Sequence, residues 1–374
     1  MKFSVNKDEF IRNLSIADSI INIKSPLAIL LNVYLEVLDD GTIIMLSYNG
    51  ENGVKVETTG VVDTPGKISL LSKKLLESVK KMPGEKIEFS TKPDSEHEII
   101  IHPEGLETPV FSLNGVSGDT YPIFSEFNWS SYIKLTQETL IELVNSTSFA
   151  ASTDTSKPAF TGTYVEESID GFMTFVTTDG KRLAMIMREY EEKKGAIELG
   201  VIIPEKIFHA IHHILSTGEV LFSIHDNQAF FKIGNVYLFS NLVEGKFPNY
   251  KDVIPAEKIN IATLNGASFL NAIEIVSVMC DSDTGKTTLE LTANKMAFHT
   301  LHPIYGMSKH EIDVEYSGNP ITVAFNYKAM VEFLKVLGGK KMEFVLNSQS
   351  SPMLLKAEGD DNYVYISMPL KLHD

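Results

Sequence analysis

The amino-acid sequence carries one pattern three times, at intervals of 127–130 residues. Each copy opens with a short apolar strand followed by a short helical pattern, and the helical patterns contain the apolar pairs Phe10-Ile11, Leu140-Ile141 and Phe269-Leu270. A serine closes the last strand pattern of each copy, at Ser112, Ser240 and Ser367. The units of solenoid proteins span only about 20–50 residues, so copies of this length are whole domains. The sequence predicts three similar domains in an arc, which a second chain can close into a ring.

Each copy contains a second helical pattern that ends near a glycine, as helices commonly do. These patterns cover residues 72–82, 205–215 and 327–337. Tyr121-Pro122 and Phe247-Pro248 end the first two copies, and a proline after an aromatic residue favours an extended linker. We therefore predict three domains, at 1–125, 126–254 and 255–374.

Much of the remaining sequence alternates between apolar and polar residues, as at 42–48, 53–59 and 97–101. A period of two is typical of strands that bury one face. Helical patterns are few and do not alternate regularly with strand patterns. We predict an α+β fold with antiparallel sheets rather than a doubly wound parallel sheet.

The composition excludes several classes of protein. Cys280 is the single cysteine, so the chain has no intrachain disulfide and no metal–thiolate cluster, as expected in a reducing cytosol. The first residues lack the apolar core of a signal peptide. The longest apolar stretch, 27–35, is far too short to span a membrane. We expect a cytoplasmic protein with no membrane segment.

The chain has a net charge of −16, from 33 basic and 49 acidic residues, which by itself argues against a nucleic-acid surface. Charge can be segregated, however, and the second helical pattern of each copy is locally basic or titratable. The residues on this polar face are Lys73, Lys74, Lys80, Lys81, Lys206, His209, His213, Lys328 and Lys335.

For any single helix, a solvated surface is the simpler interpretation of such a face. Repetition in three copies favours an anionic partner instead. The lysines are not interleaved with aromatic residues, which stacking of single-stranded DNA requires. They also lack the arginine and asparagine pattern that reads base edges. The pattern favours contact with the phosphate backbone of double-stranded DNA, independent of base sequence.

Motifs for nucleotide or calcium binding are incomplete. Residues 285–288 resemble the end of a phosphate loop, but Cys280 stands where the first glycine of that loop belongs. Asp281 and Asp283 begin like a calcium loop, but Thr292 replaces its bidentate glutamate.

The sequence also gives no support for a metal site or a catalytic site. His209, His212 and His213 could hold a metal, but a solvated helix face is the simpler interpretation. Asp179-Gly180 is first a tight-turn signal, and neither a nucleophile nor a second acid stands near it. We expect no catalytic residue, no metal and no cofactor.

Five stretches stand in order along the chain: MKFSVNKDEFIRNL at 1–14, SPLAILLNVYLEV at 25–37, TTDGKRLAM at 177–185, NLVEGKFPNYKDVIP at 241–255 and YISMPLKL at 365–372. In this order and spacing they resemble the bacterial DNA sliding clamps, the β subunits of DNA polymerase III. The resemblance implies a non-catalytic homodimeric ring with helices inside and sheets outside. Such a ring encircles double-stranded DNA and tethers the replicative polymerase, a clamp loader and other clamp-binding-motif proteins.

The resemblance also implies a pocket for partner peptides. Its residues would be Phe160, Thr178, Gly180, Lys181, Arg182, Leu183, Pro248, Val253, Ser351, Ile366, Met368, Pro369, Leu370 and Lys371. Five of them would form an apolar cleft for a short linear peptide: Leu183, Val253, Ile366, Met368 and Leu370. Arg182 and Ser351 would fix the peptide backbone.

Two further sets of residues follow from the resemblance. The DNA-binding set is Lys24, Lys73, Lys74, Lys80 and Lys206. At the dimer interface, Phe111 and Leu113 of the first domain would pack near Val278 and Met279 of the partner's third domain. Packing of these four residues inside their own domains is an equally weighted alternative.

The sequence departs from the family pattern at several positions. Asp252 and Lys371 replace arginines, Glu205 stands where a basic residue is common, and His373 and Asp374 extend past the usual end. Partner preference is therefore expected to differ. Two other functions remain as alternatives: a repeat-built protein-interaction scaffold without a DNA role, and an enzyme with a divergent active site.

Overall fold

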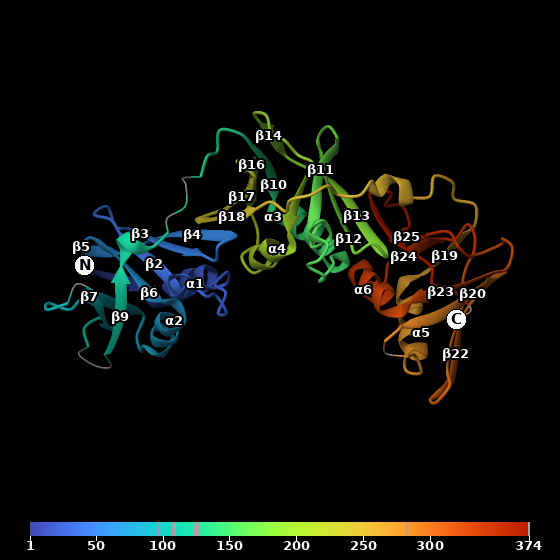
Figure 1. Cartoon of the computed structure of the whole chain (residues 1–374), viewed down its shortest axis with the longest axis horizontal. Helices are drawn as coiled ribbons and strands as arrows, with labels where there is room; N and C mark the ends of the chain where they lie inside the picture. The colour runs from blue at the N-terminus through green and yellow to red at the C-terminus, as the bar shows by residue number, and fades with distance from the viewer. Residues whose placement is uncertain (96, 107–109, 123, 125–126, 282, 373–374) are drawn as a thin grey trace. The chain divides into compact units, whose positions relative to one another are not determined.

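The computed structural model describes residues 1–374 except 96, 107–109, 123, 125–126, 282 and 373–374 (Figure 1). The chain forms two compact units. The first contains Met1–Glu138, Glu191–Glu198 and Lys206–Leu242, and the second contains Thr139–Tyr190, Leu199–Glu205 and Val243–Asp374. The border between the units runs through the middle copy of the repeat rather than between copies.

The same order of elements occurs in all three copies. The first copy consists of β1 (Lys2–Asn6), α1 (Lys7–Asp18), β2 (Asn32–Val37), β3 (Thr42–Tyr48), β4 (Asn52–Thr59), β5 (Val61–Thr64), β6 (Gly66–Leu71), α2 (Ser72–Lys81), β7 (Lys86–Thr91), β8 (Glu98–Pro103) and β9 (Phe111–Ser117). The second consists of β10 (Tyr132–Thr136), α3 (Gln137–Asn145), β11 (Gly162–Ile169), β12 (Phe172–Thr178), β13 (Arg182–Glu189), β14 (Glu192–Lys194), β15 (Val201–Pro204), α4 (Glu205–His212), β16 (Glu219–His225), β17 (Gln228–Ile233) and β18 (Val236–Asn241).

The third copy consists of β19 (Ile261–Asn265), α5 (Gly266–Ser277), β20 (Lys286–Thr292), β21 (Lys295–His302), β22 (Gly306–Asp313), β23 (Ile321–Asn326), α6 (Tyr327–Leu337), β24 (Lys341–Val345), β25 (Met353–Ala357) and β26 (Tyr363–Ser367). A bridge between Thr263 and Glu315 stands where the other copies have the short strands β5 and β14. Short 3-10 helices lie in the connections: η1 (Ala28–Leu31), η2 (Gly118–Thr120), η3 (Ser148–Ala150), η4 (Pro158–Phe160) and η5 (Tyr250–Val253). None of the helices in the described part of the chain is long and apolar enough to cross a membrane.

The described strands form three sheets. The first unit holds one sheet, in the order β14-β10-β16-β17-β18-β4-β3-β2-β6-β9-β8-β7-β1-β5. The second unit holds two, β15-β11-β12-β13-β26-β25-β24-β19 and β22-β21-β20-β23. Each described pairing between these strands is antiparallel. The prediction of an α+β fold with antiparallel sheets is confirmed.

Two of the sheets continue from one copy of the repeat into the next. Strand β18 of the second copy pairs with β4 of the first, with Leu238 opposite Val54. Strand β26 of the third copy pairs with β13 of the second, with Tyr365 opposite Ala184. Because backbone hydrogen bonds cross these boundaries, the compact units do not coincide with the three copies.

Among the free sheet edges of the described chain, two belong to the same series as these junctions. Among the described residues, β22 pairs on one side alone, with β21. Residues 111–114 of β9 likewise pair with β8 alone, and only the end of β9 reaches β6. These two edges correspond by position to the edges that join the other copies.

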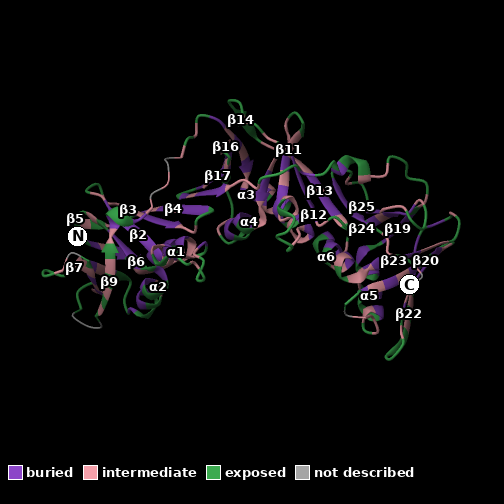
Figure 2. Cartoon of the chain, in the orientation of Figure 1, coloured by how far each residue is buried: buried purple, intermediate pink, exposed green. Residues whose placement is uncertain are grey.

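Local sequence patterns account for the elements. In β1 the alternate residues Phe3 and Val5 are buried, while Lys2 is exposed. In α2 the apolar residues Leu75 and Val79 are fully buried on one face. Figure 2 shows the same division throughout, with buried residues running along the strands and exposed residues in the loops.

Helix ends also follow the sequence, with one exception. Asn326 precedes α6 and accepts a hydrogen bond from the amide of Ala329 at 3.2 Å. Gly338 ends that helix in the left-handed region, with φ 67°. Helix α4, expected to reach residue 215, ends at His212. The chain tightens there, because the amide of Ile214 bonds the carbonyl three residues back.

The pairing of β4 with β18 yields a prediction about stability. Gly53 stands opposite Phe239, and a Cβ atom at Gly53 would overlap the buried Phe239 ring. We expect Gly53→Ala to lower the free energy of unfolding by about 1–3 kcal/mol, as overpacked cores do. In a Phe239→Leu background the same change should cost much less, because the overlapping ring is gone. Urea unfolding of the four chains measures this coupling, and an equal loss in both backgrounds would contradict it.

Candidate functional site

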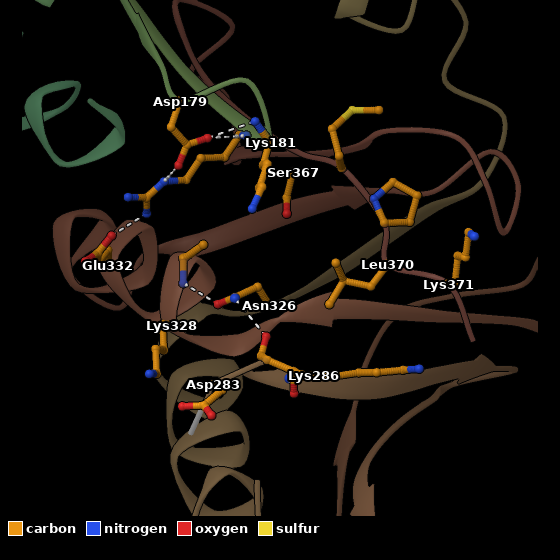
Figure 3. Close-up of a pocket in the computed structure, with 15 residues that line it drawn as sticks. Asp179, Lys181, Asp283, Lys286, Asn326, Lys328, Glu332, Ser367, Leu370 and Lys371 are labelled. Atoms are coloured by element: carbon orange, nitrogen blue, oxygen red, sulfur yellow. Dashed lines mark hydrogen bonds and ion pairs between the residues drawn. The ribbon is translucent and has the colours of Figure 1, made fainter. Parts of the chain in front are cut away.

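A cavity of about 880 Å³ lies in the second unit (Figure 3). Four segments border it: the turn between β12 and β13, the loop before β20, the start of α6 and the chain that follows β26. Its lining residues are Asp179, Lys181, Arg182, Asp283, Thr284, Lys286, Asn326, Lys328, Ala329, Glu332, Ser367, Met368, Pro369, Leu370 and Lys371.

The segment after β26, residues 368–372, is held at several points by hydrogen bonds. The amide of Met368 donates to the carbonyl of Lys181 at 2.9 Å, and the amide of Leu370 donates to the carbonyl of Ala324 at 2.7 Å. The Nζ atom of Lys286 donates to the carbonyl of Leu372 at 3.2 Å. This tail therefore joins the eight-stranded sheet to the four-stranded sheet and forms one wall of the cavity.

The turn between β12 and β13 is built around Asp179. Its Oδ1 atom accepts the amides of Lys181 and Arg182 at 2.8 and 3.0 Å. Gly180 adopts φ 88°, which glycine tolerates and other residues rarely do. The hydroxyl of Thr178 receives the Gly180 amide at 3.0 Å and donates to the carbonyl of Arg182. The sequence identified this segment correctly as a tight turn.

Arg182 is a largely buried cation, with 12% of its side chain exposed. Its Nε atom bonds Asp179 Oδ2 at 3.1 Å, its Nη1 atom pairs with Glu332, and its Nη2 atom donates to the carbonyl of Phe149 at 2.6 Å. Burial lowers the pKa of Arg182, but the hydrogen bond that it donates to Glu332 and the surrounding negative charges outweigh burial and raise the pKa overall. Three of its five N–H donors are thus engaged inside the protein, and its expected contact with a peptide backbone stays a prediction.

The expected apolar cleft is partly closed. Leu183 and Ile366 are 3% and 1% exposed, because they belong to a core cluster with Val176 and Phe247. Val253 packs against the same cluster and is partly buried. Of the five predicted cleft residues, Met368 and Leu370 line the cavity.

The cavity contains some members of the predicted pocket and not others. Those that line it are Lys181, Arg182, Met368, Pro369, Leu370 and Lys371. Those that do not are Phe160, Thr178, Gly180, Leu183, Pro248, Val253, Ser351 and Ile366. Ser351 bonds within its own turn, because its hydroxyl donates to the carbonyl of Ser348 at 2.9 Å.

Sequence reasoning missed the side of the cavity formed by the third copy. Asp283, Asn326 and Glu332 come from a loop, a helix cap and a helix face. Asn326 could have been predicted as a helix N-cap, because an asparagine before a helical pattern commonly has that role. Nothing in the sequence near Glu332 indicates its pairing with Arg182, which lies 150 residues away.

The predicted basic residues lie on the surface. Lys24, Lys73, Lys74, Lys80 and Lys206 are all exposed. Lys74 pairs with Glu77 at 2.9 Å, and Lys206 lies 3.7 Å from Glu51. Lys206 and His209 on α4, together with His213 directly after it, line a second cavity, of about 710 Å³, in the first unit. In the described residues no cluster of three or more metal-binding side chains occurs.

Glu205 departs from this basic pattern because it points into the protein. The hydroxyl of Thr163 donates to Glu205 Oε2 at 3.0 Å, and Oε1 is buried. Burial raises the pKa of Glu205 to about 7, although hydrogen bonds from Thr163 and Ser148 lower it. Because its side chain lies inside the protein, Glu205 does not reduce the positive charge on the exposed face of α4.

Comparisons with known proteins agree along the whole chain. Family models of the DNA polymerase III beta subunit match its N-terminal domain at residues 1–125, its central domain at 134–249 and its C-terminal domain at 251–371. The beta sliding clamp of Synechococcus elongatus is 26% identical over 380 residues, and that of Staphylococcus aureus strain Mu50 is 25% identical over 393; each alignment covers 100% of both chains. The crystal structure of the Bacillus subtilis DNA polymerase sliding clamp has the same fold, with a TM-score of 0.93, 23% identity and 100% of both chains covered.

Glu205 generates a prediction about pH. The folded chain binds a proton on Glu205 up to about pH 7, whereas the unfolded group releases it near its ordinary value of 4.5. Stability from this group is therefore present at low pH and is lost as the pH rises through this range. We expect Glu205→Gln to stabilise the chain by about 1–3 kcal/mol at pH 8 and to have little effect at pH 4.

Urea unfolding at the two pH values measures this difference. The matched control is Glu138→Gln, which changes an exposed glutamate in the first turn of α3. It should leave the pH dependence of stability unchanged. Equal behaviour of the two variants would contradict the role assigned to burial.

Proposed function

Because the chain belongs to the DNA polymerase III beta subunit family, the beta sliding clamps, we propose that two copies join head to tail into a ring around duplex DNA. Its function is that of a DNA sliding clamp. The ring acts without catalysis, in the cytoplasm, by keeping other proteins on DNA that passes through it. Three domains, at 1–125, 126–254 and 255–374, form each half.

The observation that carries ring closure is the pair of strand edges left over by the repeat. The first and second copies join through β4 and β18, and the second and third through β13 and β26. The remaining edges, on β22 and on residues 111–114 of β9, are the equivalent pair. Pairing of β22 of one chain with β9 of another gives both edges backbone hydrogen-bond partners. Two such junctions are equivalent and close the assembly.

The side chains near these edges support the same junction. Ile304 beside β22 is 82% exposed, Met307 on β22 is 64% exposed, and Val110 beside β9 is 51% exposed. Val278, at the end of α5, is 74% exposed, and α5 packs against β22. None of Phe111, Leu113, Val278 and Met279 is buried within its own chain, which favours the interface over the alternative of an intradomain core.

DNA contact in this proposal is electrostatic and independent of base sequence. The exposed residues Lys24, Lys73, Lys74, Lys80 and Lys206 would meet phosphate oxygens, while the remainder of the acidic chain repels DNA. Topological enclosure removes the need for tight binding, so the ring can slide.

The partner site in this proposal is the surface around the tail, residues 368–372. Met368 and Leu370 offer apolar contacts, and Met adapts to differently shaped ligands. The partners are the replicative polymerase, a clamp loader and other clamp-binding-motif proteins, each using a short peptide with apolar residues.

Enclosure can be tested with circular DNA. A clamp loaded onto a nicked circular plasmid by a bacterial clamp loader and ATP should stay on it through gel filtration. It should be lost when a restriction enzyme cuts the plasmid, because the ring then slides off an end. Equal retention before and after cutting would favour ordinary binding, and no retention on either would favour the protein-interaction scaffold.

The dimer interface can be tested with one substitution. Val278→Asp should place a charge in the apolar junction and convert dimers into monomers of 41.6 kDa, because burying an unpaired carboxylate is costly. Light scattering after size exclusion measures the mass. Val61→Asp is the matched control, since Val61 on β5 is 65% exposed and lies outside the proposed junction. A Val278→Asp dimer as stable as the control would contradict the assignment.

A further inference from the structure

The cavity that α4 helps to line in the first unit contains groups whose charge changes with pH. Its volume is about 710 Å³, and three segments border it: residues 19–22 after α1, the turn at 49–52 between β3 and β4, and residues 206–213. The charged and titratable residues that line it are Glu51, Lys206, His209 and His213. The other lining residues carry no charge. The two histidines therefore decide how the charge of this cavity depends on pH.

Hydrogen bonds fix the segments that border this cavity. The Oδ1 atom of Asn49 accepts the amides of Glu51 and Asn52 at 3.0 and 2.8 Å, and its Nδ2 atom donates to the carbonyl of Ile20 at 2.9 Å. The amide of Asn241 donates to the carbonyl of Glu51 at 3.0 Å, at the junction where β18 pairs with β4. The turn before β4 is thus tied both to the chain after α1 and to the second copy, which contains α4.

The permanent charges of the cavity oppose each other. Lys206 Nζ lies 3.7 Å from Glu51 Oε2, so one positive and one negative charge offset each other at the mouth. His209 and His213 are exposed, and neither has a hydrogen-bond or ion-pair partner among the described residues. Histidine is the side chain that gains its charge between about pH 8 and pH 5. Acidification therefore adds up to two positive charges to a cavity that otherwise carries almost none.

The groups around the cavity do not cancel this gain. Among the described residues, Glu51 is the one carboxylate that lines it. Asp18, at the end of α1, lies outside the lining and accepts the hydroxyl of Ser72 at 2.6 Å. His212 is exposed, also lies outside the lining, and has its ring centre 6.1 Å from that of His213, so its protonation adds charge of the same sign. The surface around α4 becomes more attractive to an anion as the pH falls.

We propose that His209 and His213 make the contact between this chain and duplex DNA depend on pH, because the cavity that they line holds a DNA phosphate group more strongly once both are protonated. The inference rests on the DNA contact of the proposed function and adds its regulation. DNA phosphodiesters keep their charge throughout this pH range, so the change arises in the protein. A ring that holds phosphates more strongly slides more slowly, and acidification therefore slows this one.

The expected size of the effect follows from the exposure of the two histidines. Each phosphate that a cationic side chain neutralises adds about 0.9 to the steepness of log affinity against log salt, so two histidines add up to about 2. Exposed ion pairs contribute little each, so the Kd for DNA should fall only about three- to tenfold between pH 8 and pH 6.

Direct binding of the full-length protein to a short, fluorescently labelled linear duplex tests the proposal. Anisotropy titrations at pH 6 and pH 8, each at several low salt concentrations, give the Kd and its salt dependence. The wild-type protein should bind more tightly at pH 6 and with a steeper salt dependence. Light scattering at both pH values shows whether the mass of the protein is the same, so that a change of assembly is not read as a change of contact.

Two double variants change the charge of the histidines in opposite ways. His209→Gln with His213→Gln keeps polar side chains that cannot be protonated, and the Kd should then be the same at both pH values. His209→Lys with His213→Lys is charged at both, so it should bind DNA more tightly than the wild-type protein at pH 8 and also lose the pH dependence. His97→Gln, an exposed histidine of the first unit outside the cavity, is the matched control and should keep the pH dependence.

The outcomes separate this inference from the proposed function. An equal Kd of the wild-type protein at pH 6 and pH 8 would overturn the inference, and so would a pH dependence that survives in the glutamine double variant. Loss of the pH dependence in His97→Gln would overturn it as well, because the effect would then be one of total charge. Retention on circular DNA without direct binding at either pH would overturn the phosphate contact and leave the ring standing. Failure of both assays would end the proposed function, and the inference with it.

Discussion

Backbone hydrogen bonding between strand edges is the interaction on which this chain depends. Strand β18 pairs with β4 and β26 pairs with β13, so that each sheet continues from one copy into the next. Each copy of the repeat thereby supplies donors and acceptors that its neighbour needs. Apolar packing strengthens the junctions, as where Phe239 lies over Gly53, but the register of the strands sets which residues meet.

The cavity at the tail depends on a second constraint, the burial of one guanidinium group. Arg182 connects the turn at Asp179 to α6 through Glu332 and to η3 through the carbonyl of Phe149. A buried cation with several partners fixes the geometry of the elements that supply them. The arginine therefore serves the frame of the cavity, for which its planar group with several donors is suited.

Features set by local pattern could be predicted from the sequence. The period-two strands and the turn at Asp179 depend on residues close together in the chain, and the threefold repeat is visible when segments 127–130 residues apart are compared. The tail after Ser367 could also be identified, because its residues lie in one short stretch. The predicted end of α4 at residue 215 was wrong, because the chain tightens after His212 in a way that apolar periodicity does not report.

Features set by distant partners could not be predicted. Leu183 and Ile366 have the composition of an open apolar cleft, but pairing of their strands places them face to face in a core. The role of Arg182 depends on Glu332, which is far from it in the sequence. Ion pairs between residues far apart in the chain produce no periodic pattern in the sequence.

The two strand edges left over by the repeat have a consequence for a newly synthesised chain. Unpaired edges accept any strand of suitable length, and the charged residues Lys309 and Glu311 on β22 only partly discourage this. A third molecule can add to either edge as readily as the second, and head-to-tail addition that fails to close grows into a fibre. Production of the chain in excess, or slow release from the ribosome beside other copies, would therefore favour aggregation over assembly.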